Sequence, residues 1–274
     1  MNLSEAIEFT IQNRESWAIG KGAKTAAINA RHVERILGGD LSIYEIETKH
    51  FTQLTHQLKA EGKRPATINR ITAALSTILT ELRQHGYKLD PVSYKRQKEP
   101  KGRPEFYTEE EIHTLLKEAK KEDDYMLLHD SILFAIKTGC RQGELLKLTF
   151  DDIDLEEHKA IFRDVKTDGD HIIHLHDDLV EVLERRKMYA INNEVFQWRD
   201  KDQLLRTLRA TQKKCGIPKE KCWHTFRHTT ATWLIERGVN IRTVMGVLNH
   251  SNINTTLRYA KTTDRSVEAA ISLI

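Results

Sequence analysis

The spacing of apolar residues in the first third of the chain predicts helices. Apolar side chains recur at steps of three and four residues, which places them on one face of a helix. Each such stretch is followed by glycine, a residue that often ends a helix. The three stripes are Ala26, Ala30, Val33 and Leu37 before Gly38, then Phe51, Leu54 and Leu58 before Gly62, then Ile68, Ile71, Leu75, Ile78 and Leu82 before Gly86. Residues 1–90 are therefore predicted to form an all-helical domain.

The pattern is lost in the next stretch. Residues 88–104 contain three prolines, one glycine and six basic residues, a composition that disfavours a packed helix or strand. We predict a basic linker over residues 91–104. Such a linker can follow a phosphate backbone, because counterion release does not require a folded surface.

Helical spacing returns in residues 105–274, the second predicted domain. Thr108 as the N-cap and Glu111 three residues later form a capping box, which predicts a helix start. A following apolar stripe ends at Gly139, a candidate C-terminal glycine of the next helix.

One short region of the second domain predicts strands instead. Residues 161–165 and 171–175 are rich in β-branched residues and flank Asp168-Gly169, a strong hairpin signal. Helical spacing resumes at Leu179. The predicted fold class is therefore mainly α with a small β-sheet or hairpin region, in two domains.

Composition narrows the class of protein. No run of eighteen apolar residues occurs, so we expect no membrane span, and the first residues lack the pattern of a secretory signal. Cys140, Cys215 and Cys222 are odd in number and widely spaced. This usage favours a reducing cytoplasm over disulfide pairing.

The net charge of +3 conceals an asymmetry between the two predicted domains. Residues 1–104 hold 17 lysines and arginines against 11 aspartates and glutamates, whereas the remaining residues hold 26 against 29. A basic first part indicates a polyanionic partner. Ordinary solvated lysines explain the same charge equally well.

Polar residues beside the third apolar stripe, and basic residues of the linker, are candidate contacts to phosphates or bases. The alternative is an ordinary solvated helix face. The candidates are Thr67, Asn69, Arg70 and Thr77 on the helix, and Lys95, Arg96, Lys98, Lys101 and Arg103 in the linker.

Residues 224–259 carry chemical groups that helix packing alone does not require. His224 and Arg227 lie three residues apart and share a helical face, and His250 and Tyr259 follow. Together they suggest a phosphate clamp with an oxygen nucleophile. The core stripe of the same helix is predicted to point elsewhere and consists of Phe226, Thr230, Trp233 and Leu234.

Taken with two earlier motifs, these residues resemble the signature of the tyrosine recombinases, the phage-integrase-like site-specific recombinases. The matches occur in the family's order over roughly half of the chain. They are Arg141 and Glu144 in the family's T-G-x-R-x-x-E-L motif, Lys166 in its β-hairpin, His224, Arg227 and His228 in H-x-x-R-H-T, and His250 and Tyr259 in L-G-H-S and the tyrosine nine residues on.

The resemblance implies a C-shaped DNA clamp made of an all-α core-binding domain and a mixed α+β catalytic domain. The implied function is site-specific recombination, the integration or excision of a phage or mobile element, through a 3′-phosphotyrosyl intermediate. Bond energy is kept in that intermediate, so we expect no cofactor and no metal. The implied partners are double-stranded DNA with specific core sites and, through the C-terminal tail, three further copies in a tetramer. The expected location is the cytoplasm of a bacterial host, on its DNA.

Physical chemistry supports the implied roles. Attack on a phosphodiester places negative charge on its non-bridging oxygens, which two permanently charged guanidiniums, Arg141 and Arg227, can hold. His250 can add a hydrogen bond. The roles left for the other residues are nucleophile for Tyr259, base for His224 and general acid for Lys166.

Departures from the family pattern and other interpretations stay open at this point. Asn249 stands where the family usually has glycine, although asparagine tolerates the left-handed conformation, and Asp168 and Asp170 make the hairpin acidic. The C-terminal tail can also fold back on its own domain. The other functions considered are a type IB topoisomerase, a DNA-binding accessory protein with a decayed active site, and a zinc site of unrecognised spacing made of Cys215, Cys222, His224 and His228.

Overall fold

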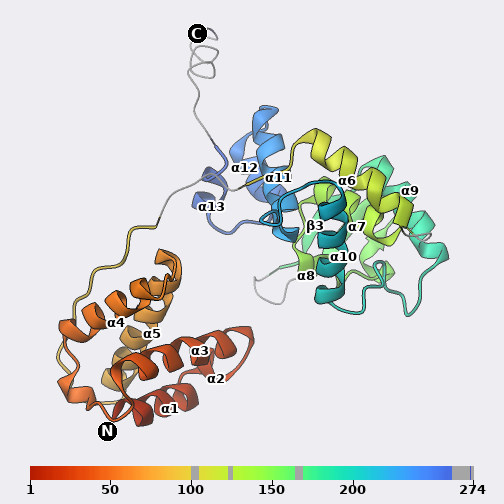
Figure 1. The fold of residues 1–274 in the computed structure, drawn as a ribbon. Coiled ribbons are helices and arrows are strands. Elements are labelled where there is room, and N and C mark those ends of the chain that lie inside the picture. The colour runs from red at the N-terminus through yellow and green to blue at the C-terminus, as the bar shows by residue number, and fades with distance from the viewer. Residues whose placement is uncertain (100–104, 123–125, 164–168, 261–271, 273–274) are drawn as a thin grey trace. The chain divides into compact units, whose positions relative to one another are not determined.

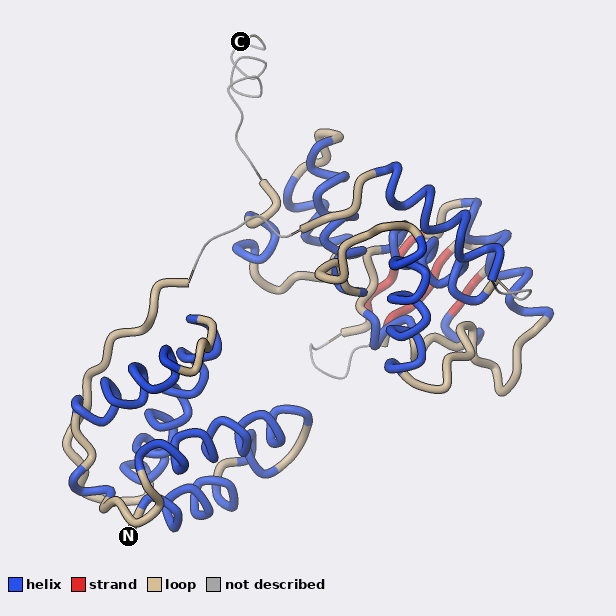
Figure 2. The backbone as a smooth tube through the Cα atoms, viewed as in Figure 1, coloured by secondary structure: helices blue, strands red, loops and turns tan. Residues whose placement is uncertain are grey.

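The computed structural model describes residues 1–99, 105–122, 126–163, 169–260 and 272. It divides the chain into two compact units, Met1–Lys101 and Gly102–Ile274. Helices dominate both units, and the strands lie in the second (Figures 1 and 2). The predicted fold class, mainly α with a small sheet, is therefore confirmed.

The first unit is helical, and its core contains most residues of the three predicted apolar stripes. Leu54, Ile71 and Leu75 are fully buried in its core. The backbone at Gly38 has a φ of 89°, which ends the helix before it as predicted. The helices are α1 (Leu3–Asn13), α2 (Glu15–Ala18), α3 (Lys21–Leu37), α4 (Thr48–Ala60) and α5 (Pro65–Gln84), with a 3-10 turn at Ile43–Glu45.

Residues 88–99 have neither helix nor strand, as predicted, but they are not a free linker. The ring of Tyr94 stacks on Phe51 of α4 with centroids 4.5 Å apart, and Thr48 Oγ1 donates a hydrogen bond to the carbonyl of Ser93 at 3.0 Å. Leu89 and Val92 also pack against the core of the first unit. The absence of a helix or strand in residues 88–99 is therefore as predicted, and the structure adds that their side chains pack against the first unit.

The second unit joins eight helices to a small sheet within the described residues. The capping box at its start is present: the Thr108 amide donates to Glu111 at 2.8 Å, and the Glu111 amide donates to Thr108 Oγ1 at 3.1 Å. The elements are α6 (Glu109–Glu122), α7 (Leu127–Thr138), α8 (Gln142–Leu145), a 3-10 turn (Phe150–Asp152), β1 (Ile153–Asp154), β2 (Lys159–Phe162), β3 (His171–His174), α9 (Asp177–Met188), α10 (Lys201–Lys214), α11 (Trp223–Glu236), α12 (Ile241–Val247) and α13 (Ile253–Leu257).

The sheet has the antiparallel order β1-β2-β3. Its hairpin is where the sequence predicts it. The last pair of β2 and β3 is Phe162 with His171, so the two strands are joined through residues 163–170. The predicted strand extension to residue 165 is therefore wrong at residue 163, and residues 164–168 lie outside the described part.

Helix α11 is buried on most sides rather than along one stripe. Phe226 stacks on Tyr107 with centroids 4.8 Å apart, and Thr229 accepts a hydrogen bond from the Tyr107 amide at 2.9 Å. Figure 1 places α11, α12 and α13 beside one another. Polar groups of α11 are therefore surrounded by other elements of the second unit.

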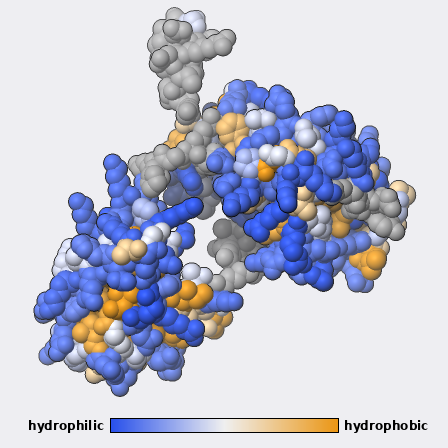
Figure 3. Space-filling model, viewed as in Figure 1, coloured by the Kyte–Doolittle hydropathy of each residue, from blue (hydrophilic) through white to orange (hydrophobic). Residues whose placement is uncertain are grey.

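The visible surface of each unit is mostly hydrophilic, with apolar patches on the first (Figure 3). Within the described residues, every helix is too short or too polar to cross a lipid bilayer.

Candidate active site

Arg141 lies three residues after the last residue of helix α7 and forms the N-cap of α8. The backbone at Gly139 adopts a left-handed φ of 66°, which ends α7 as predicted and turns the chain toward Arg141. Arg141 Nη1 donates to Glu144 Oε1 at 2.5 Å, and its Nη2 donates to the carbonyl of Asn249 at 3.2 Å. The guanidinium of Arg141 therefore pairs with nearby Glu144 and also contacts Asn249, which is distant in the sequence.

Arg227 is the buried cation of this cluster, with 3% of its surface exposed. Its Nη1 donates to the carbonyl of Gly139 at 2.8 Å, and its Nη2 donates to the carbonyl of Leu248. The side chain thus ties α11 to the ends of α7 and α12. Burial, and then the charge of Arg141, lowers the pKa of Arg227 to about 10, so the guanidinium still carries its charge at neutral pH.

His250 follows the turn that ends α12. Asn249 adopts a φ of 47° there, which confirms that asparagine takes the left-handed conformation expected of glycine. His250 Nδ1 lies 2.9 Å from the hydroxyl of Thr256, a fully buried residue of α13. Burial, followed by the charges of Arg227 and Arg141, lowers the pKa of His250 to about 4.

Tyr259 follows α13 and is only 2% exposed. Its ring packs with Ala231, Val244 and Leu248, and its hydroxyl oxygen lies 2.5 Å from Nδ1 of His228. Burial raises the pKa of Tyr259, and the charge of Arg227 opposes this rise. The hydroxyl is therefore a neutral group held inside the second unit, beside the buried cation.

His224 lies one turn before His228 on α11 and is exposed. The two rings meet edge to face with centroids 4.7 Å apart. The pKa of His224 is lowered, first because the surrounding protein excludes water from the ring and then by the charges of Arg227 and Arg141. The Tyr259 hydroxyl shares a hydrogen bond with His228 and not with His224, the residue expected to be the base.

Five of the six predicted catalytic residues thus come together in the second unit: Arg141, His224, Arg227, His250 and Tyr259. The sixth, Lys166, lies outside the described residues. Two residues of the site were not assigned a role from the sequence. His228 contacts Tyr259, and His171 of β3 places its Nε2 3.0 Å from the carbonyl of Gly246 on α12. The sequence feature that could have indicated His228 is its position one residue after Arg227. No spacing in the sequence indicated His171.

The candidate DNA-contacting residues of the first unit differ in their exposure and in their hydrogen bonds. Asn69 is 3% exposed and uses its amide to hold the linker: its Nδ2 donates to Gln97 O at 2.9 Å and to Glu99 Oε1 at 2.7 Å, and its Oδ1 accepts from the Gln97 amide at 2.7 Å. The prediction that Asn69 contacts DNA is therefore corrected to a structural role, because every polar atom of its side chain is engaged.

The other candidates remain on the surface or lie outside the described residues. Arg70, Lys95, Arg96 and Lys98 are exposed, and Thr67 and Thr77 are half-buried. The hydroxyl of Thr77 donates to the carbonyl of Ala73 on its own helix at 2.8 Å, and Arg96 lies 3.6 Å from Glu99. Lys101 and Arg103 fall outside the described residues.

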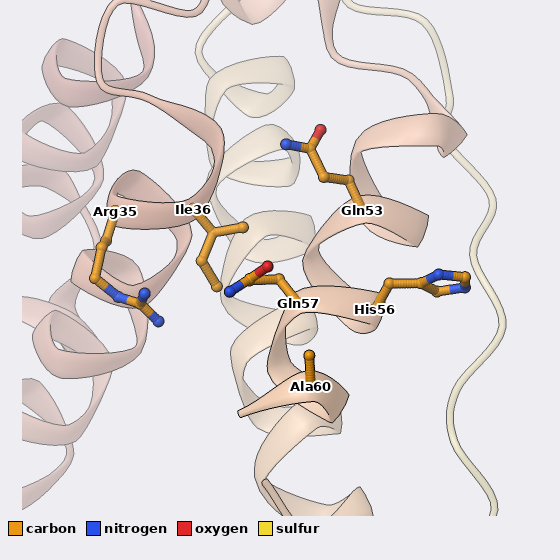
Figure 4. Close-up of a pocket in the computed structure, with 6 residues that line it drawn as sticks. All are labelled: Arg35, Ile36, Gln53, His56, Gln57 and Ala60. Carbon is orange, nitrogen blue, oxygen red and sulfur yellow. The ribbon is translucent and has the colours of Figure 1, made fainter. Parts of the chain in front are cut away.

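A polar pocket of about 570 Å³ lies between α3 and α4, away from the predicted residues. In Figure 4, His56 points away from Arg35, whereas Gln57 lies on the side facing it. Arg35 Nη2 donates to both carboxylate oxygens of Glu61, at 2.7 and 2.9 Å. Because the guanidinium of Arg35 is already paired with Glu61, this arginine does not offer a free cation to the pocket.

Within the described ranges, no three histidine, cysteine, aspartate or glutamate side chains are placed to hold a metal ion.

Comparison with known proteins identifies the arrangement. A model of the phage integrase family matches residues 105–266. The tyrosine recombinase XerA of Thermococcus kodakarensis is 30% identical over 259 residues, which cover 89% of this chain and 86% of that protein. XerA of Thermococcus onnurineus is 28% identical over 274 residues, covering 94% and 93%.

Solved structures agree at the level of the fold. The Tn1549 transposon integrase in complex with a circular intermediate DNA has a TM-score of 0.84 at 19% identity, covering 100% of this chain and 99% of that one. A lambda integrase dimer bound to a core site has a TM-score of 0.79 at 18% identity, covering 95% and 77%. The chain belongs to the phage integrase family and is an enzyme of the tyrosine recombinase type.

Proposed function

We propose that this enzyme breaks and rejoins double-stranded DNA at specific core sites by linking Tyr259 to a 3′ phosphate. The observation that carries the proposal is the gathering of Arg141, Arg227 and His250 around the same part of the second unit as the Tyr259 hydroxyl. A tyrosine beside two guanidiniums is suited to attack a phosphodiester, because the cations hold the charge that develops on the phosphate.

Both guanidiniums keep donors for a phosphate. A guanidinium has five N–H groups, and the contacts described above use one on each Nη of Arg227. Arg141 likewise uses one N–H of each Nη. Those contacts fix the two planes before substrate binds. Each preorganised donor to the transition state contributes about 3 kcal/mol.

The remaining roles concern the phosphate and the leaving group. His250 adds a hydrogen bond to the phosphate, and its contact with Thr256 orients the ring. Lys166 protonates the leaving 5′ oxygen, and His224 is available to the phosphate from the exposed side of α11. Because the phosphotyrosyl bond conserves the energy of the broken bond, rejoining requires no cofactor.

The first unit is proposed to bind the DNA that surrounds the cleaved phosphate. Arg70, Lys95, Arg96 and Lys98 are exposed there, and cations that neutralise phosphates gain affinity through counterion release. The solved relatives named above are bound to DNA. Lys101 and Arg103 are proposed to extend this basic surface, and residues 1–90, 91–104 and 105–274 are the proposed binding domain, linker and catalytic domain.

Assembly and location follow from the same proposal. Four copies act together on two DNA sites, linked by the C-terminal tail, and they work on DNA in the cytoplasm. Strand exchange requires such an assembly because two duplexes must be cut and rejoined with each other. The named relatives are recombinases, so neither DNA relaxation alone nor a decayed active site is favoured.

The test is covalent capture. Incubating the enzyme with fragmented host DNA, isolating protein-linked ends and sequencing them maps the cleavage site. A duplex of that sequence with a nick beside the cleaved phosphate then traps the adduct, because the short cut strand diffuses away. The wild type is expected to accumulate protein–DNA adduct and Tyr259→Phe to form none. Absence of adduct with the wild type overturns the proposal.

Strand exchange separates recombination from relaxation. Two labelled duplexes carrying the mapped site are expected to yield recombinant strands, whereas a topoisomerase only relaxes a supercoiled plasmid. Relaxation without recombinant product would contradict the proposed function.

A further inference from the structure

The hydroxyl of Tyr259, the proposed nucleophile, lies close to His228, a residue to which the family motifs assign no role. The Tyr259 hydroxyl oxygen and His228 Nδ1 lie 2.5 Å apart, and the two ring centroids are 5.5 Å apart at 45°. His224 lies one turn earlier on α11, where its ring meets the ring of His228 edge to face. Tyr259 therefore reaches the buried interior of the site with its hydroxyl directed at His228.

We propose that His228 is the catalytic residue that orients Tyr259 and accepts its hydroxyl proton during attack on DNA. This inference rests on the proposed function. In the step, the phenolic oxygen forms a bond to phosphorus, the bond from phosphorus to the 5′ oxygen breaks, and the phenolic proton moves to His228 Nδ1. The leaving 5′ oxygen takes its proton from the general acid, and rejoining reverses both transfers.

Transfer of the proton to His228 requires a particular form of the imidazole. Nδ1 accepts a proton only when its lone pair is free, which is the neutral tautomer that carries its hydrogen on Nε2. Tyr259 donates in that arrangement. The burial that raises the pKa of Tyr259 makes an acceptor necessary, because the hydroxyl keeps its proton at neutral pH.

The surroundings keep His228 neutral. Burial is the largest cause, and the neighbouring His224, Arg258, Arg227 and His250, each unfavourable to a second positive charge nearby, act in the same direction, lowering its pKa to about 4. Above that pH the lone pair of Nδ1 is available, and it is lost as pH falls through the pKa. An anionic phosphate bound beside these cations favours the protonated ring, and so helps His228 to accept the proton as attack begins.

A purely structural role for His228 makes different predictions. Packing or orientation alone requires a side chain of similar size with a hydrogen-bonding atom near the Nδ1 position. Asparagine offers such an atom but does not accept a proton at neutral pH. His228→Asn therefore separates orientation of Tyr259 from proton transfer, and His228→Ala removes both.

The experiment measures adduct formation in a single turnover on the nicked duplex, with full-length protein. His228→Asn and His228→Ala are expected to lower the rate by about 100-fold or more, the usual range for loss of a general base. The matched control is His113→Asn on the exposed face of α6, which leaves the rate unchanged. DNA binding and thermal unfolding of each variant identify any loss that comes from misfolding.

Two chemical substitutions test whether the rate loss in His228→Asn arises from transfer of the Tyr259 hydroxyl proton. Fluorinated tyrosine at position 259 ionises at lower pH, so it is expected to restore part of the rate in His228→Asn but not in His224→Asn. Sulfur in place of the bridging 5′ oxygen leaves without a proton. That substrate is expected to rescue variants lacking the general acid and to leave the defect of His228→Asn in place.

The outcomes distinguish the two proposals. If the wild type forms adduct and His228→Asn forms it at the wild-type rate, or if the sulfur substrate rescues His228→Asn, the inference about His228 is wrong and the proposed function stands. If fluorinated tyrosine gives no rescue, proton transfer to His228 is also wrong. If the wild type itself forms no adduct, the proposed function fails first.

Discussion

Helix α5 of the first unit and helix α11 of the second are both largely buried, but they bury different kinds of side chain. Three of the ten buried residues of α5 are polar, Asn69, Thr72 and Glu81. Five of the eight buried residues of α11 are polar, including Arg227. The apolar stripe of α5 therefore forms a core, whereas α11 presents hydrogen-bonding groups to the elements around it.

The difference shows how the enzyme holds a charged site in place. A buried polar group is costly unless it has a partner, and the partners of Arg227 are backbone carbonyls at the ends of α7 and α12. The cost of burial is thus offset by contacts that also position the site. In α5 the buried polar group has a structural partner instead. The side-chain amide of Asn69 donates hydrogen bonds to Gln97 and Glu99 and so holds this segment against the helix.

Among the variants that test this difference between α5 and α11, Arg227→Ala is expected to lower stability and adduct formation the most. Two buried carbonyls lose a charged donor, so the second unit is expected to lose about 3 kcal/mol of unfolding free energy, along with adduct formation. Tryptophan fluorescence reports mainly on this unit, because three of the four tryptophans, Trp198, Trp223 and Trp233, lie within it.

Arg141→Ala is the matched control for that variant. The Arg141 side chain is 39% exposed, so the expected stability loss is below about 1 kcal/mol, while adduct formation is equally impaired. DNA binding by the first unit is expected to survive in both variants. Equal destabilisation by the two alanines would contradict the distinct structural role of Arg227.

Gly139→Ala tests how closely the framework of the site is packed. A Cβ at this position would lie 2.6 Å from Leu248 Cδ2, and the φ of 66° disfavours any side chain. We expect a loss of about 2 kcal/mol and slower adduct formation, measured by chemical unfolding and on the nicked duplex. Gly216→Ala has a similar φ of 67° but no atom within 4 Å, so it should cost only the backbone term, about 1 kcal/mol.

Asn69→Ala tests the buried polar group of α5. Losing the bonds to Gln97 and Glu99 is expected to cost about 1.5 kcal/mol and to release residues 88–99. Trypsin should then cut faster after Lys95 and Arg96, as measured by limited proteolysis. Thr77→Ala, whose hydroxyl bonds only its own helix, should leave the cleavage rate unchanged, and equal rates for both variants would place the segment's attachment elsewhere.

The smallest effect is expected from Asn249→Gly. Glycine adopts the left-handed φ of 47° at lower cost than asparagine, so we expect a stabilisation of about 0.5 kcal/mol in thermal unfolding, with adduct formation retained. Asn193→Gly, at a φ of 63° away from the site, should stabilise similarly without touching the turn before His250. A destabilised Asn249→Gly would mean that the asparagine side chain itself supports that turn.

Much of the fold could be predicted because local rules govern it. The stripe of α5, the Thr108–Glu111 capping box and the glycine after α7 depend on residues within one or two turns of each other. The end of β2 was misplaced, because strand length and register are decided by which side chains reach the core. Here Phe162 is buried and pairs with His171.

For the candidate site, the residue types and their order were readable from the sequence, because they match the motifs of the tyrosine recombinases, and attack on a phosphodiester needs cations and a nucleophile. Which histidine meets Tyr259 was not readable. His224 and His228 lie on one helix, and only the path of α12 and α13 back across α11 brings the Tyr259 hydroxyl to His228. Likewise Asn69 could be placed on a polar face of α5, but only the packing of residues 88–99 buries it. Contacts between distant segments depend on how whole elements pack, and a local pattern does not encode that.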